Sequence, residues 1–202
     1  MIAVILRSVV RQARRHPLYV GLNVFGLALG IGVFLTLALV VRFEYSFNTG
    51  FVDADRLARM DEHWSEPGTT LFESADVSFR ALPFLKQDFS EIEGAVTFTA
   101  TTLNVQKNGQ FTHFFGRMTD PEFFRMFSLR LLQGNPDTAL TQPDGLVLTR
   151  QAAMTVFGKS DVLGKTVEIN RIGQKNTYIV TGVLGDVPSP GLLDNVDMLL
   201  PV

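Results

Sequence analysis

The longest apolar stretch of the chain lies near its N-terminus. Residues 18–41 contain no charged side chain over 24 positions. An α-helix rises about 1.5 Å per residue, so this stretch is long enough to cross the roughly 30 Å hydrocarbon core of a bilayer. A buried helix of a soluble protein rarely runs this long without a charge, and a cleaved signal peptide has a shorter apolar core of about 7–15 residues. The pattern therefore predicts a membrane-spanning helix within residues 17–47.

Small and polar side chains interrupt this stretch. Gly26 and Gly30 form a GxxxG pair, and we expect Ala28 and Gly32 to form a second small pair beside it. Small residues let helix backbones approach closely and so favour association in lipid, although glycine is also common in membrane helices generally. We expect a helix–helix contact at these residues. Asn23 either bonds a neighbouring helix or lies near the interface, and the sequence leaves both open.

A short basic segment precedes the span. Apolar residues recur at helical spacing along residues 1–16, and the remaining positions include four arginines: Arg7, Arg11, Arg14 and Arg15. This pattern predicts an amphipathic helix in the inner membrane interface, near anionic lipid headgroups. Pro17 separates it from the span, because proline is tolerated at a helix start but breaks an interior. Two roles remain open for this segment. Its arginines either only set the orientation of the span in the membrane, or the segment is an elbow helix that contacts a cytoplasmic partner.

Charge is distributed unevenly along the chain. Residues 1–42 carry five arginines and no acid, whereas residues 43–202 carry 13 basic and 20 acidic side chains. Because positively charged flanks remain in the cytoplasm, we expect a cytoplasmic N-terminus and an extracytoplasmic body. An acidic body disfavours nucleic-acid binding, which requires a basic surface. Cysteine is absent from the sequence, which excludes disulfides and thiolate metal sites.

The remaining residues predict a mixed α+β body. β-branched and alternating patterns favour strands at residues 56–64, 95–105, 110–118, 146–148, 166–169 and 178–184. Asn108-Gly109 predicts a hairpin turn, and a second turn is expected near Gly173. Helical spacing and capping residues favour helices at residues 77–89, after 119–122, and at 149–157. We expect the aromatic cluster at residues 123–127 to be core packing and not a ligand cage.

Patterns for catalysis and metal binding are absent from the sequence. The chain has three histidines, and none of them lies in an HExxH motif: His16, His63 and His113. Gly158-Lys159-Ser160 lacks the preceding glycine of a phosphate-binding loop. We therefore expect no catalytic residue, no cofactor and no metal.

Several stretches, in order, resemble one known family. They are Asn23–Gly30 (NVFGLALG), Glu44–Asn48 with Asp55–Leu57, Asp120–Phe124 with Leu132–Gly134, Leu146–Gly158 with Leu163–Val167, and Tyr178–Val183. Together they resemble the MacB/FtsX-like permease subunits of ABC transporters, at their N-terminal helix and extracytoplasmic core domain. The resemblance implies an α+β fold for residues 48–202, with a porter-like βαβ part and a smaller β-rich subdomain, on the periplasmic side of a bacterial inner membrane.

The resemblance also implies a function without catalysis. Members of this family do not hydrolyse ATP; a separate or fused ATP-binding subunit does, and the permease carries the movement across the membrane for export or mechanotransmission. We expect the chain to be the N-terminal part of such a permease and a homodimer, with the ATP-binding subunit, other transmembrane helices and the lipid bilayer as partners. The family has three further membrane spans, and this sequence contains no second apolar run long enough to cross a membrane. We therefore expect a fragment or a truncated gene product.

Two other functions remain open from the sequence. A single-span adaptor or regulatory protein would bind another envelope protein through residues 48–202 and transport nothing. A membrane-tethered enzyme would depend on His63 and His113. An in-frame continuation beyond Val202 with three apolar runs would favour the permease, whereas a stop codon there would favour the adaptor.

Overall fold

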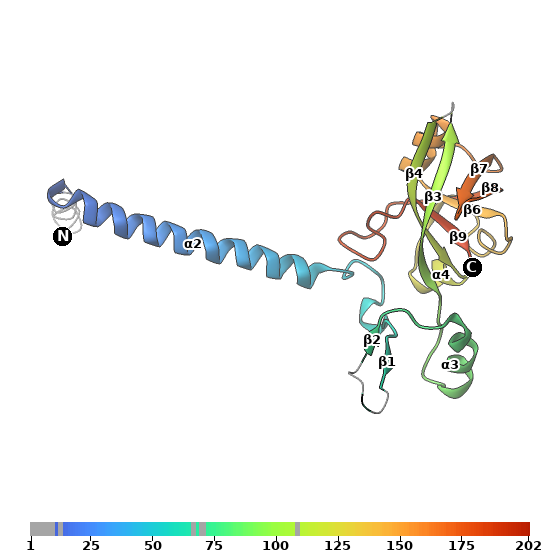
Figure 1. Cartoon of the computed structure of the whole chain (residues 1–202), viewed down its shortest axis with the longest axis horizontal. Coiled ribbons are helices and arrows are strands. Elements are labelled where there is room, and N and C mark those ends of the chain that lie inside the picture. Colours follow the sequence, from blue (N-terminus) through green and yellow to red (C-terminus); the bar gives the residue numbers. More distant parts are fainter. Residues whose placement is uncertain (1–10, 12–13, 66–67, 69–71, 108–109) are drawn as a thin grey trace. The chain divides into compact units, whose positions relative to one another are not determined.

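The computed structural model describes residues 11, 14–65, 68, 72–107 and 110–202. The chain divides into two compact units, residues 1–47 and 48–202 (Figure 1). The fold is mixed α+β, with one N-terminal apolar helix followed by a β-rich unit.

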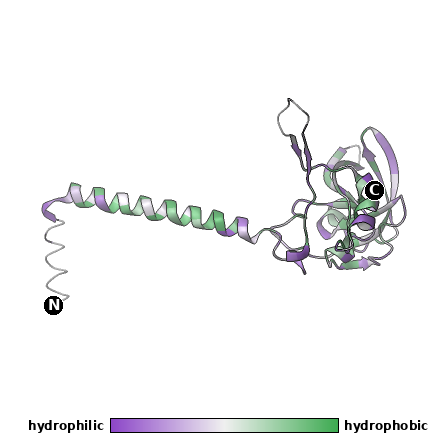
Figure 2. Ribbon diagram, turned by 90° about the horizontal axis from the view of Figure 1, so that it is seen from below, coloured by the Kyte–Doolittle hydropathy of each residue, from purple (hydrophilic) through white to green (hydrophobic). Residues whose placement is uncertain are grey.

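The first unit is dominated by helix α2, Pro17–Ser46. It has 30 residues, none of them buried, and within the described residues it is the one helix long and apolar enough to cross a membrane. Figure 2 shows hydrophobic residues along most of its length. The helix begins at Pro17, which fits in a first turn because the missing N–H needs no partner there. It contains the whole uncharged stretch of residues 18–41, continues for five residues beyond it, and lies within the predicted span of residues 17–47.

Short elements open the second unit. They are the 3₁₀-helix η1 (Ala54–Arg56), strands β1 (Glu62–Trp64) and β2 (Phe72–Ser74), the 3₁₀-helix η2 (Phe79–Ala81) and helix α3 (Leu82–Asp88). The prediction of a strand over residues 56–64 is correct only for its last three residues, which pair with β2. The predicted helix at 77–89 is shorter, because Pro83 lies in the first turn of α3 and proline is excluded from a helix interior.

Seven strands form the main sheet. They are β3 (Phe98–Lys107), β4 (Gln110–Thr119), β5 (Leu131–Gly134), β6 (Gly145–Thr149), β7 (Thr166–Arg171), β8 (Gln174–Leu184) and β9 (Met198–Pro201). Their order is β5-β8-β6-β9-β4-β3-β7, and β7 also pairs with β8. Six of the strands therefore close into a ring, and β5 extends it along β8. The strands β4 and β9 run parallel, as do β6 and β8.

Most of the sequence-predicted pairings are confirmed. Strands β3 and β4 form an antiparallel hairpin, although its predicted turn at residues 108–109 lies outside the described residues. Strands β7 and β8 meet across Ile172-Gly173, where both residues have positive φ. Helix α5 (Arg150–Phe157) joins β6 to β7, and β7 then turns into β8, which pairs in parallel with β6.

The helix ends follow from capping chemistry at α5 but not at α4 (Phe123–Met126). The Thr149 hydroxyl accepts the Ala152 N–H at 3.2 Å, and Gly158 ends α5 with φ 73, both as predicted. The predicted cap at residues 119–122 is wrong. The Asp120 carboxylate instead accepts the N–H of Thr97, which ties it to the segment before β3.

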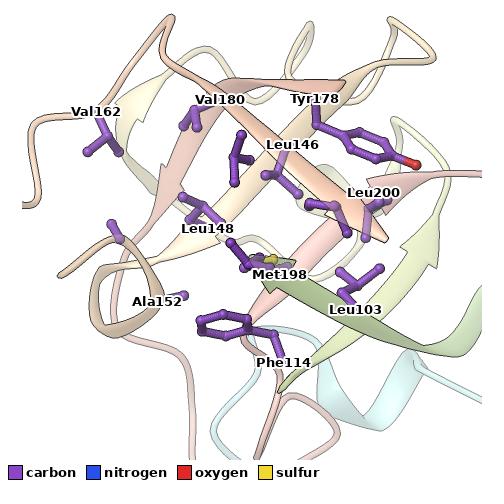
Figure 3. Packing of buried hydrophobic residues seen from close by; sticks show 14 of the residues in the cluster. Leu103, Phe114, Leu146, Leu148, Ala152, Val162, Tyr178, Val180, Met198 and Leu200 are labelled. Carbon is purple, nitrogen blue, oxygen red and sulfur yellow. The ribbon is translucent and has the colours of Figure 1, made fainter. Parts of the chain in front are cut away.

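Two hydrophobic clusters share the central strands. One lies inside the ring and against α5, and includes Leu103, Phe114, Leu146, Leu148, Met198 and Leu200 (Figure 3). The other contains Val147, Leu199 and the buried rings Phe123 and Phe124, so the aromatic cluster packs in a core as predicted. Because alternate residues of β6 and β9 face opposite clusters, both strands are apolar on both faces.

Candidate functional site

The small residues of α2 lie on two faces of the helix. Successive helical residues turn by about 100°, so Asn23, Gly26 and Gly30 share one side. Ala28 and Gly32 lie on the opposite side and not beside them, which corrects the expected arrangement. All five are exposed, and an added Cβ at any of the three glycines would meet nothing within 4 Å in the described structure. Both faces are thus open to close approach by other helices.

The basic segment before α2 is described only in part. Arg11, Arg14 and Arg15 are helical and exposed. Arg7 and most of the predicted amphipathic helix lie outside the described residues. The three exposed guanidinium groups supply positive charge at the N-terminal end of the apolar helix.

The second unit begins with a tightly held segment, residues 48–51, which we call the joint. The N–H of Asn48 donates to the carbonyl of Pro190 at 2.9 Å, and its side-chain oxygen accepts the N–H of Leu192 at 2.7 Å. Asn48 has φ 62, a conformation that asparagine tolerates better than most residues. At Gly50, a Cβ would lie 2.6 Å from the Cβ of Pro188, so only glycine permits this close approach.

Aromatic packing continues from the joint into the body. Phe51 is 5% exposed, and its ring meets Phe127 edge-to-face at 5.2 Å. Phe127 lies 4.8 Å from Phe123, which stacks on Phe98 at 5.4 Å. The guanidinium of Arg117 lies 5.2 Å from the centre of the Phe98 ring. A continuous series of rings therefore connects the joint to strand β4.

Sequence reasoning did not find the joint. Its two hydrogen bonds and its close packing join residues about 140 positions apart, and no local motif encodes such contacts. A weak signal was present in Asn48-Thr49-Gly50, because asparagine and glycine are the residues that tolerate left-handed or crowded backbone.

The titratable groups do not converge. His63 and His113 are exposed on different strands, and the Nδ1 atom of His63 lies 3.5 Å from the Oε1 atom of Glu73 across the β1–β2 pair. Among the described residues, no group of three histidine, aspartate or glutamate side chains could hold a metal ion. Desolvation, with the neighbouring Lys159 ammonium, lowers the pKa of Lys165.

One family model matches most of the chain, and solved structures share its fold. Residues 20–202 match the family model described as the MacB-like periplasmic core domain. A solved domain assigned to a permease of Porphyromonas gingivalis has a TM-score of 0.55 and 22% identity, over 70% of this chain and 60% of that one, which shows a shared fold. The chain thus spans well under the full length of that domain. No curated protein sequence matches the chain.

Two further solved structures are similar at lower TM-scores. The extracellular domain of the noncanonic ABC-type transporter YknZ from Gram-positive bacteria gives 0.47 at 17% identity, over 62% of each chain. The periplasmic region of MacB from Actinobacillus actinomycetemcomitans gives 0.41 at 20% identity, over 60% of this chain and 52% of that one.

Proposed function

The chain belongs to the family of the MacB-like periplasmic core domain, and we propose that it is the N-terminal part of an ABC transporter permease subunit. In this proposal residues 1–16 lie on the cytoplasmic side, residues 17–47 span a bacterial inner membrane, and residues 48–202 form the extracytoplasmic domain. A partner subunit hydrolyses ATP, and this chain transmits the movement without catalysing a reaction.

The observation that carries the proposal is the joint directly after α2. A domain can follow the movement of a membrane helix only if the chain leaving that helix is fixed to the domain. Asn48 is held by two hydrogen bonds to the 190–192 loop, and Phe51 is buried among core rings. Displacement of the helix end therefore pulls on the core of the domain and not on a slack linker.

The two small faces of α2 support an assembly with more than one neighbouring helix. In lipid, apolar surface alone does not drive helix association, so close packing at small residues and hydrogen bonds supply it. The face with Gly26 and Gly30 also carries Asn23, whose amide can bond across a helix pair. We assign this face to the other helices of the permease. The face with Ala28 and Gly32 is left for a second copy of the chain.

Two measurements on the full-length permease test the proposal: co-purification of an ATP-binding subunit, and the dependence of the ATPase rate on the joint. Tagged permease is expected to retain an ATP-binding subunit encoded beside it, and the ATPase rate of that complex is then compared among variants. Asn48→Ala removes one of the two hydrogen bonds of the joint and is expected to lower the stimulated ATPase rate several-fold. Asn135→Ala is the matched control, since it removes the same kind of hydrogen bond, from the N–H of Asp137 to the Asn135 side-chain oxygen at 2.9 Å, outside the joint.

Two results would contradict the proposal. The first is a permease that retains no ATP-binding subunit under conditions that preserve membrane complexes, which would favour a single-span adaptor. The second is an Asn48→Ala complex whose stimulated ATPase rate equals that of Asn135→Ala, which would remove the joint from the coupling.

A further inference from the structure

An open groove of about 870 Å³ crosses one face of the β3–β4 hairpin. Leu103 and Val105 of β3 point into the core, so the alternate residues Ala100, Thr102 and Asn104 point the other way and line the groove. Strand β3 also contributes Thr101, and three further segments complete the lining: Phe115–Arg117 of β4, the Ile172-Gly173 turn, and Asp194-Asn195. Small residues on β3 between larger neighbours give the surface its hollow form.

Two large apolar side chains at the groove have no role in the fold. Ile172 is 90% exposed, and Phe115 is 65% exposed. Ile172 also has φ 50, which is a genuine outlier for a β-branched residue. Asparagine is the usual residue at this position of a two-residue hairpin turn. Ile172 therefore costs stability both by strain and by exposure, and such a cost, where it persists, points to a functional surface.

The groove also contains a positive charge with no carboxylate partner. Arg117 is its one basic lining residue, and the described residues include no ion pair to it. Its guanidinium is held over the Phe98 ring, and its Nε atom is buried without a hydrogen-bond acceptor. The carboxylate of Asp194 is already engaged by the N–H of Gly191 at 2.9 Å. A fixed guanidinium is thus available in a chain segment, 43–202, that is otherwise predominantly acidic.

We propose that this groove binds an extended polypeptide segment of an extracytoplasmic partner, in which an acidic side chain lies next to apolar ones. The carboxylate pairs with Arg117, because a guanidinium binds a carboxylate through charge-assisted hydrogen bonds. The apolar side chains cover Phe115 and Ile172. The hydroxyl of Thr102 and the side-chain NH₂ of Asn104, whose Oδ1 atom is buried, bond the backbone of the segment, whereas an acyl chain would leave these polar groups without partners.

Selection from a random 12-residue peptide display library tests the proposal. The full chain is immobilised in nanodiscs of zwitterionic lipid, so that no ATP-binding subunit is needed and failure of the permease proposal would not alter the result. We expect the selected peptides to be enriched in Asp or Glu beside Leu, Ile or Phe. By fluorescence anisotropy, Arg117→Gln should raise the Kd of a selected peptide about tenfold or more. Arg130→Gln, an equal loss of charge at an exposed site outside the groove, should not.

A second variant separates binding from folding. Ile172→Asn removes the apolar side chain and relieves the strained φ, so it should raise the Tm of the chain while it weakens peptide binding. A damaged fold would instead lower both the Tm and the affinity for the peptide. The proposal is overturned if the library yields no binders, if the binders lack acidic enrichment, or if both groove variants bind like wild type. It is also overturned if Arg117 instead mediates binding to anionic vesicles, or if Ile172 mediates a dimer seen by sedimentation velocity.

Discussion

Replacing Phe51 with alanine tests whether the joint is fixed to the core of the second unit. The Phe51 ring is 5% exposed and meets Phe127 edge-to-face at 5.2 Å. Removing a buried phenylalanine side chain costs about 3–5 kcal/mol of stability, from lost transfer free energy and the cavity that remains. Folded domains are stable by only about 5–15 kcal/mol, so this loss is large.

For Phe51→Ala we expect a loss of unfolding free energy near the low end of this range, about 3 kcal/mol, because the joint lies near the start of its unit and can relax toward the cavity. The relaxation has a local signature. The N–H of Leu192 donates to the side chain of Asn48, so loosening of the joint releases this amide. Hydrogen exchange should therefore accelerate at residues 188–193 more than in the central strand β6 (Gly145–Thr149).

The assay combines urea unfolding of the full chain in detergent with hydrogen exchange read by mass spectrometry. Phe111→Ala is the matched control, because Phe111 is 52% exposed on β4 and its removal should cost less than about 1 kcal/mol. The reasoning is refuted if Phe51→Ala unfolds at the same urea concentration as Phe111→Ala and leaves exchange at residues 188–193 unchanged. In that case the joint would not be part of the core, and the proposed transmission of helix movement to residues 48–202 would lose its attachment.

Three further changes have defined outcomes. Gly134→Ala should cost about 3 kcal/mol or more in urea unfolding, because its Cβ would lie 2.2 Å from a carbonyl oxygen of β8; Gly158→Ala, also at positive φ but with nothing within 4 Å, should cost about 1 kcal/mol. Thr149→Ala should cost about 1 kcal/mol by removing the cap of α5, and an unchanged unfolding midpoint would contradict this role. Gly26→Leu with Gly30→Leu should abolish crosslinking of α2 to other permease helices in membranes while membrane insertion persists, and retained crosslinking would exclude this face.

Features that depend on neighbouring residues were predictable from the sequence. Helix α2 follows from composition alone, since a run of 24 uncharged, mostly apolar residues is rarely anything other than a membrane-spanning helix. The β3–β4 and β7–β8 hairpins follow from strand patterns around short turns. Thr149 and Gly158 mark the ends of α5, because a hydroxyl cap and a left-handed glycine act within one helical turn.

Features that depend on contacts between distant residues were not predictable from the sequence. Strand β9 has four residues and finds its partner β4 about 80 positions earlier, so its short apolar run could equally be a loop in a core. Strand β5 is equally short, and within the part of the chain that the structure describes it pairs with β8 alone. The groove takes its lining from four separate segments, and its hollow form arises only when the sheet closes. Positive φ at Ile172, and the absence of an ion pair to Arg117 among the described residues, are properties of the folded chain that no residue pattern predicts.

The joint and the groove are linked both through the stack of rings that ends at Phe98 and through residues 190–195, where Asp194 of the groove lining accepts the N–H of Gly191. Phe98 stacks on Phe123, which leads through Phe127 to the joint, and it also supports the guanidinium of Arg117. Contact between sites is not in itself energetic coupling, which requires an element whose state both sites bias. Substitution of Phe98 would disturb both sites at once and could not distinguish them. The informative changes are therefore at the two ends, Phe51 for the joint and Arg117 for the groove, each of which leaves the ring stack between them in place.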